Sequence, residues 1–116
     1  MLSTMPIQCV VIMNELVSIA DWDEAMTRER VLVMVSKSDC DECEDALAGI
    51  SCLGAEDVRI LSLDNPEASP LKAELEWLGV EVDVVPFWRL FVGGEVGGTV
   101  RGPNLERVRS MLSESE

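Results

Sequence analysis

Blocks of apolar and polar residues alternate along the chain and predict strands and helices in turn. Residues 31–35 form a continuous apolar run rich in β-branched side chains, which is typical of a strand covered on both faces. Apolar residues then recur at helical spacing from Cys43 to residue 53, where Gly54 ends the pattern. We therefore expect a central strand followed by a helix that has Cys40 in its first turn.

The same pattern predicts the other elements. Ser38 and Asp39 can cap the helix that holds Cys40, and Asp21 can cap a shorter helix ahead of the central strand. Two strands around Gly93-Gly94 have the pattern of a β-hairpin. In full, we expect strands at 7–13, 31–36, 58–63, 87–92 and 96–101, and helices over about 21–26, 40–53, 71–78 and 105–112.

Length and composition indicate one globular α/β domain. A chain of 116 residues with 47% hydrophobic residues can bury an ordinary core and is short for two domains. We expect a single domain over 1–116 with its core at about 16–113. Residues 1–15 are then an N-terminal extension or an extra strand.

The charge balance excludes some partners. With 22 acidic residues, 9 basic residues and a net charge of −13, the chain lacks the clustered cations that nucleic-acid binding needs. No apolar stretch approaches the length of a membrane span, and residues 1–14 lack a basic leader, so we expect a cytoplasmic protein that binds no membrane. The acidity itself fits either solubility or docking to a basic partner.

Four cysteines supply the candidate chemistry. Cys40 and Cys43 are three residues apart, which places them on one face of a helix and within reach of a disulfide. Cys40 lies at the positive end of the helix dipole, so we expect its thiolate to attack a partner's disulfide and Cys43 to resolve the mixed disulfide. Cys9 and Cys52 are interpreted as small core residues.

The order of these motifs resembles the thioredoxin family over about residues 16–113. The shared features are a strand that ends before Cys-x-x-Cys, Val85-Pro86, a glycine hairpin, Gly102 and a last helix. The resemblance implies a thioredoxin-like fold, with a central mixed sheet of four to five strands flanked by helices on both faces. It also implies that Pro86 is cis and faces the dithiol, and that the backbone of Val85 pairs with the substrate chain.

The activity that the resemblance implies is that of a thiol-disulfide oxidoreductase. Its partners would be a protein disulfide substrate and a reductase or small-thiol electron donor, and it would need no tightly bound cofactor. We expect such a protein to work as a monomer.

The chain also departs from the family. Asp39 stands where thioredoxins have Trp, and Asp41-Glu42 replaces their Gly-Pro. Acidic neighbours disfavour a thiolate at Cys40, so we expect a weak oxidant, and a dedicated basic partner fits this surface better than general substrates. The family's buried acid–base pair is replaced by Met34 and Ile60.

Other interpretations stay open at this stage. The chain could be a thioredoxin-like adaptor or chaperone module that turns over few disulfides, or a metal site that uses its four cysteines. Trp88 is interpreted as a packing residue. Arg89 and Arg101, on the two hairpin strands, are interpreted as solvated side chains that face outward.

Overall fold

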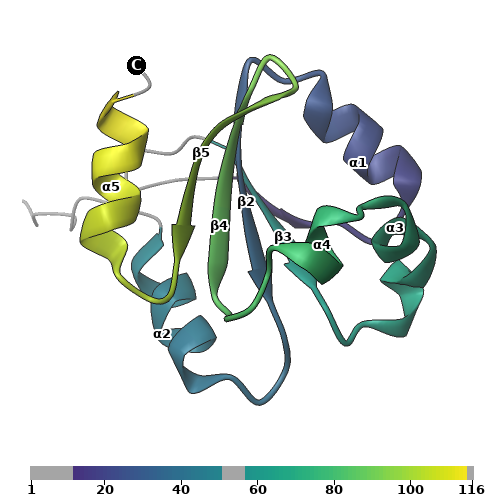
Figure 1. Cartoon of the computed structure of the whole chain (residues 1–116), viewed down its shortest axis with the longest axis horizontal. Coiled ribbons are helices and arrows are strands. Elements are labelled where there is room, and N and C mark those ends of the chain that lie inside the picture. Colours follow the sequence, from purple (N-terminus) through teal and green to yellow (C-terminus); the bar gives the residue numbers. More distant parts are fainter. Residues whose placement is uncertain (1–11, 51–56, 115–116) are drawn as a thin grey trace, which may run out of the picture.

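A mixed five-stranded sheet forms the centre of the computed structural model, which describes residues 12–50 and 57–114 (Figure 1). The strands lie in the order β1-β3-β2-β4-β5. They are β1 (Ile12–Glu15), β2 (Arg30–Ser36), β3 (Asp57–Ser62), β4 (Phe87–Val92) and β5 (Glu95–Arg101). β3 runs parallel to β1 and β2, whereas β4 is antiparallel to β2 and β5. The predicted mixed sheet is therefore confirmed.

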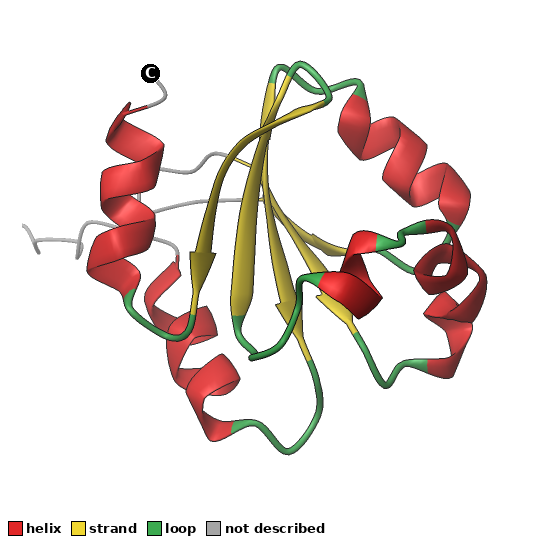
Figure 2. Ribbon diagram, in the orientation of Figure 1, coloured by secondary structure: helices red, strands yellow, loops and turns green. Residues whose placement is uncertain are grey.

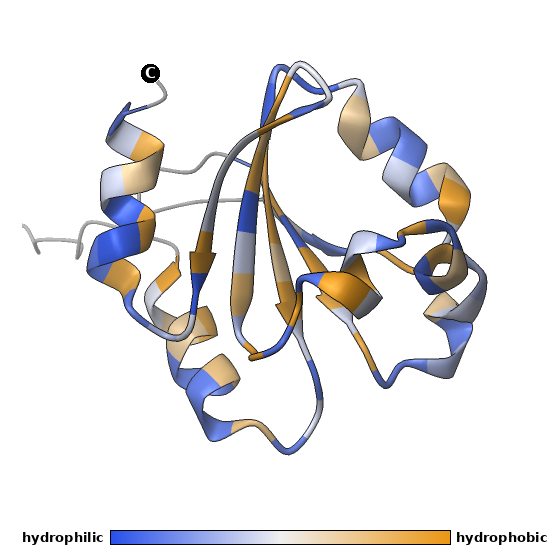
Figure 3. Ribbon diagram, viewed as in Figure 1, coloured by the Kyte–Doolittle hydropathy of each residue, from blue (hydrophilic) through white to orange (hydrophobic). Residues whose placement is uncertain are grey.

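Helices cover both faces of this sheet. They are α1 (Ile19–Met26), α2 (Asp41–Gly49), the 3₁₀ turn η2 (Pro66–Ala68), α3 (Ser69–Glu74), α4 (Trp77–Val80) and α5 (Leu105–Glu114). α2 and α5 lie on one face, and α1, α3 and α4 lie on the other (Figure 1). Hydrophilic and hydrophobic stretches alternate along α1, α2 and α5 in Figure 3, as expected for helices that pack one side on a sheet.

Two apolar cores follow from this layering. Alternate residues of β2 supply both, with Leu32 and Met34 facing α2 and α5 and Val33 facing the other helices. Every residue from 31 to 36 is buried. A strand in this position has no solvent-facing side, which is why its sequence is a continuous apolar run.

The start of α1 differs from the prediction. Ser18, not Asp21, is the N-cap, and its Oγ accepts a hydrogen bond from the Asp21 backbone N–H at 3.0 Å. The Asp21 carboxylate in turn accepts from the Val17 backbone N–H at 3.0 Å. This arrangement is similar to a capping box, except that the carboxylate binds the N–H of the residue before the N-cap. The expected N-cap was therefore three residues late.

The predicted helix over 71–78 is also different, because the chain forms α3 and α4 as separate short helices. Leu75, the C-cap of α3, and Leu78 in α4 are both buried in the same core. Gly79 lies within α4 and does not end a helix.

Some expectations concern other parts of the chain. Cys9, Cys52 and the strand predicted at 7–13 fall outside the described residues, apart from the last positions of that strand, where β1 begins. Within 12–50 and 57–114, no helix is long and apolar enough to span a bilayer.

Candidate active site

The loop after β2 and the loop before β4 lie at the same end of the sheet (Figure 2). The first of these loops leads into α2 through Asp39, whose φ of 57° is in the left-handed region that aspartate tolerates better than most residues. α2 then begins at Asp41, and its N-cap is Cys40, not Ser38 or Asp39 as expected. The turn therefore places Cys40 at the N-terminus of the helix, where backbone N–H groups are unpaired.

Cys40 and Cys43 form a disulfide with a Cα–Cα distance of 5.2 Å. The Cys40 Sγ also accepts a hydrogen bond from the Cys43 backbone N–H at 3.1 Å. Cys40 is partly buried, whereas Cys43 is only 5% exposed and packs in the core under α2. The predicted pairing of these two residues is confirmed, and the two sulfurs differ in access to solvent.

The second loop brings Val85 to the cavity that Cys40 lines. The Val85-Pro86 peptide bond is cis, as the resemblance implied, and the carbonyl of Pro86 accepts a hydrogen bond from the Gly102 backbone N–H at 2.9 Å. Val84 and Val85 share a cavity of about 520 Å³ with Cys40. Of the sequence-predicted site residues, Cys40 and Val85 line this open cavity, whereas Cys43 and Pro86 do not. Val84 adds an apolar side chain that is 40% exposed.

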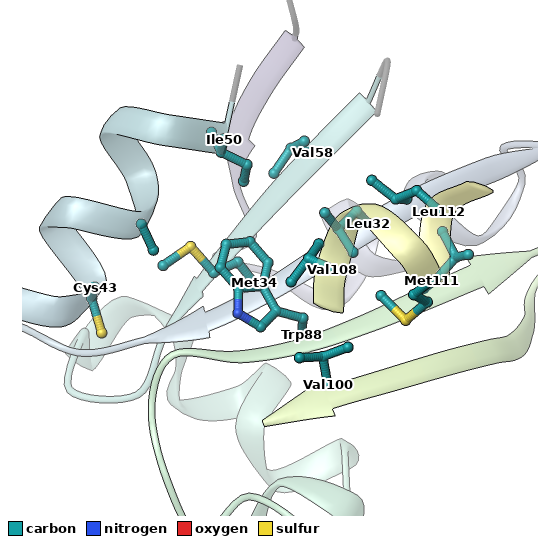
Figure 4. Packing of buried hydrophobic residues seen from close by; sticks show 12 residues of the cluster. Leu32, Met34, Cys43, Ile50, Val58, Trp88, Val100, Val108, Met111 and Leu112 are labelled. Carbon is teal, nitrogen blue, oxygen red and sulfur yellow. The ribbon is translucent and has the colours of Figure 1, made fainter. Parts of the chain in front are cut away.

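A second cavity, of about 260 Å³, lies on the inner side of α2 and is lined by Cys43. Met34 and Ile60, which are partners in the β2–β3 register, both line it. Figure 4 shows Met34 with Trp88 on the sheet face that α2 and α5 cover. Met34 and Ile60 therefore lie at the cavity beside Cys43, as the sequence predicts. The same cavity also has polar lining residues, which are Glu15, Ser36, Lys37, Glu44 and Ser62.

A carboxylate that the sequence did not single out fixes the loop before Cys40. Asp64, just after β3, accepts a hydrogen bond from the Ser38 backbone N–H at 3.1 Å and another from the Ser38 hydroxyl. The hydroxyl bond holds the pKa of Asp64 below its ordinary value, with help from the backbone bond and the Lys37 charge. β2 and β3 are parallel neighbours, so their carboxyl ends lie side by side. The predicted order of parallel strands was therefore the sequence feature that could have placed Asp64 near Ser38.

Five acidic side chains surround the start of α2, and all of them are exposed. They are Asp39, Asp41, Glu42, Glu44 and Asp45, called the acidic rim below. Lys37 is the one cation that lines either of the two cavities around the dithiol. Among the described residues, His, Cys, Asp and Glu side chains form no group of three or more that could hold a metal ion.

The structure confirms two of the interpretations made for the hairpin residues and contradicts the third. Trp88 is fully buried and donates from Nε1 to the Gly102 carbonyl at 2.9 Å, so its role in packing is confirmed. The interpretation of Arg89 as a solvated side chain is wrong, since it is only 5% exposed, whereas Arg101 is exposed as expected. Helices cover both faces of the sheet. A side chain such as Arg89, which points away from one core, is therefore covered by the helices on the other face.

Comparison with known proteins gives a fold. No family model matches the sequence, and no curated protein matches it either. Among solved structures, thioredoxin from Malassezia sympodialis superposes with a TM-score of 0.71 and 15% identity, covering 96% of each chain. Thioredoxin from Trypanosoma brucei brucei gives 0.69 and 14%, covering 98% of this chain and 97% of its own. Spinach chloroplast thioredoxin f, short form, gives 0.69 and 15%, covering 92% and 96%. The chain therefore has the thioredoxin fold, with a Cys-x-x-Cys disulfide at the N-terminus of α2.

Proposed function

We propose that this protein is a thiol-disulfide oxidoreductase whose reduced Cys40 and Cys43 thiols reduce a disulfide in a partner protein and are themselves oxidised to the Cys40–Cys43 disulfide. One observation carries the proposal: a disulfide at a helix N-terminus shares an open cavity with the backbone ahead of a cis proline. The similarity to thioredoxins, which concerns the fold, supports the same reading.

In the first step, the Cys40 thiolate attacks one sulfur of the partner's disulfide. The Cys40–partner bond forms as the partner's S–S bond breaks, and the released partner sulfur takes up a proton. Cys40 suits this role because it is the more exposed of the pair and because the N-terminus of α2 favours a negative charge. Val85 offers its backbone to the extended partner segment beside the attacked sulfur.

In the second step, the Cys43 thiolate attacks the Cys40 sulfur of the mixed disulfide. The Cys40–Cys43 bond reforms and the partner leaves with both sulfurs reduced, so two electrons pass from this protein to the partner. The N-cap geometry supports this step, because Cys43 needs no backbone movement to reach Cys40. In the cytoplasmic setting expected from the sequence, a reductase or a small thiol then returns the pair to its reduced form.

The acidic rim favours partners with basic residues around the target disulfide. All of its members are exposed, three of them (Asp39, Asp41 and Glu42) line the cavity of Cys40, and the chain carries a net charge of −13. Opposite charge speeds the encounter of two proteins, and like charge suppresses it. A basic partner is therefore the class that this surface selects.

Mixed-disulfide trapping tests the proposal. The Cys43→Ser variant should accumulate a covalent adduct with a disulfide-bonded partner through Cys40, because the resolving thiol is missing. The matched Cys40→Ser variant should accumulate no adduct, since Cys43 is only 5% exposed. Equal trapping by the two variants would contradict the assigned order of attack, and no adduct with either would contradict the exchange reaction.

One observation favours a second candidate, a thioredoxin-like adaptor that binds partners with little disulfide turnover. The titratable residues that line the cavity beside Cys43 are Glu15, Lys37 and Glu44, and all three are exposed, so no buried acid stands ready to take the proton of the resolving thiol. An adaptor would bind its partner equally well when both cysteines are replaced by serine. An oxidoreductase would lose its reaction with the partner in that double variant.

A further inference from the structure

A buried arginine lies close to the loop that carries the cis proline. Arg89 stands between Phe87 and Phe91 along β4 and is 5% exposed. Its guanidinium lies 4.7 Å from the ring centroid of Trp77 and 5.2 Å from that of Phe87. A charge removed from water in this way is tolerated only when it is paired and hydrogen-bonded.

The Arg89 guanidinium forms hydrogen bonds with two side chains. Arg89 donates from its two terminal nitrogens to the two carboxylate oxygens of Glu81, at 2.6 and 3.4 Å. Its Nε donates to the Thr99 hydroxyl at 3.0 Å. The bond from Arg89 holds the pKa of Glu81 below its ordinary value, so this carboxylate stays charged at neutral pH. A fork of this kind fixes the direction of both side chains as well as their distance.

Glu81 is the C-cap of α4 and directly precedes the docking loop, defined here as residues 82–86. A second arginine of the hairpin, Arg101, donates to the Glu81 carbonyl at 3.3 Å and pairs with Asp83 at 3.3 Å. At the far end of the loop, the Gly102 backbone N–H holds the Pro86 carbonyl at 2.9 Å. Arg101 and Gly102 therefore hold the docking loop at its two ends, and Val84 and Val85 between them line the cavity of Cys40.

We propose that Arg89 is a positioning residue for disulfide exchange, which fixes Glu81 and thereby sets where Val84 and Val85 lie opposite Cys40. This inference rests on the proposed function. Arg89 does not touch the reacting sulfurs in this account. Because Arg89 holds the docking loop in place before the partner binds, the loop loses less conformational entropy on binding. We therefore expect Arg89 to affect the affinity for the partner.

The Arg89→Lys variant isolates this effect. Lysine keeps the positive charge but loses the two-pronged contact with Glu81, the bond to Thr99 and the flat stacking on Trp77. We expect the half-saturating concentration of a protein-like disulfide to rise about tenfold, while the maximal rate changes little. The reaction of Cys40 with a small disulfide, which needs no docking loop, should keep its wild-type rate.

The chain offers a matched control in Arg59. It is a strand arginine that is 3% exposed, and it pairs with Asp57 and Glu24 at 2.7 Å each. These bonds tie β3 to α1 and do not reach the docking loop. Arg59→Lys therefore removes the same kind of buried contact without a change in partner binding.

The experiment compares reduced wild-type protein with the two lysine variants in single-turnover kinetics. One probe is a synthetic peptide with a single intramolecular disulfide flanked by lysines, and the other is 2,2′-dithiodipyridine. A rise in half-saturation confined to Arg89→Lys and to the peptide supports the inference. Unchanged peptide kinetics in Arg89→Lys, or the same rise in Arg59→Lys, overturns it.

Two further measurements keep the result interpretable. If Arg89→Lys does not fold, as urea unfolding would reveal, Glu81→Gln weakens the same contact from its exposed side and should shift the peptide kinetics in the same direction. A wild-type protein that reacts with 2,2′-dithiodipyridine but never with the peptide overturns both this inference and the proposed function. That outcome is distinct from a failure of the Arg89 contact alone.

Discussion

Reduction of the Cys40–Cys43 disulfide should lower the free energy of unfolding by an amount that follows from the loop it closes. The two cysteines are three positions apart, so the bond closes a loop of four residues. In the chain-entropy model, a loop of this size removes about 6 cal/mol/K from the unfolded ensemble, or about 1.9 kcal/mol at 25 °C. The expected loss on reduction is therefore about 2 kcal/mol.

The folded state should contribute little to this difference. Cys40 is already fixed as the N-cap of α2, and Cys43 is fixed by burial and by its backbone bond to the Cys40 sulfur. The helix thus holds the two residues at a Cα–Cα distance that suits a disulfide whether or not the bond is present. The bond then acts mainly on the unfolded chain.

Urea unfolding of the oxidised and reduced forms measures this effect, with the fluorescence of Trp22, Trp77 and Trp88 as the signal. At a typical slope near 2 kcal/mol per molar urea, the midpoint should fall by about 1 M on reduction. A variant with both Cys40 and Cys43 replaced by serine is the control, and its midpoint should not respond to reductant. Equal midpoints for the two forms of the wild-type protein would refute this reasoning.

Two further predictions concern charge. The hydrogen bond from Arg89 lowers the pKa of Glu81 in the folded protein, so the stability that this contact contributes is present above the unfolded-state pKa and is lost as the pH falls through the folded-state value. Glu81→Gln should therefore flatten the acid side of a plot of unfolding free energy against pH, and an unchanged slope would contradict this. Glu42→Lys, in the acidic rim, should slow reaction with the lysine-flanked peptide several-fold at low salt relative to reaction with 2,2′-dithiodipyridine, which accounts for the change in the Cys40 thiolate. The difference should shrink as salt rises above about 0.1 M, where the screening length is about 10 Å, and a salt-independent difference would argue against electrostatic selection.

The sequence was sufficient for the sheet and the dithiol because each has a local signature. A continuous apolar run specifies β2, which is buried on both faces, and Cys-x-x-Cys at a strand-to-helix turn places Cys40 and Cys43 within bonding distance. The resemblance then supplied Val85 and Pro86, which no local pattern would have connected to the cysteines. These residues meet only through the sheet, since β4 pairs with β2.

The contacts that hold the site in place were not predictable in the same way. Glu81 and Arg89 form their pair because α4 packs over β4, and Asp64 reaches Ser38 because β2 and β3 end side by side. Each contact joins residues whose relation is set by tertiary packing. Arg89 was misread for the same reason, because alternation along a strand tells which residues share a face but not whether a helix covers that face.

The most direct test of the central claim is a redox titration of Cys40 and Cys43, in a Cys9→Ala/Cys52→Ala background that leaves no other thiol. The protein would be equilibrated in graded dithiothreitol or glutathione buffers, and the fraction of dithiol would be measured by thiol alkylation and tryptophan fluorescence. We expect one reversible transition that fits two electrons per chain. Failure to form an intramolecular disulfide in any of these buffers would contradict it.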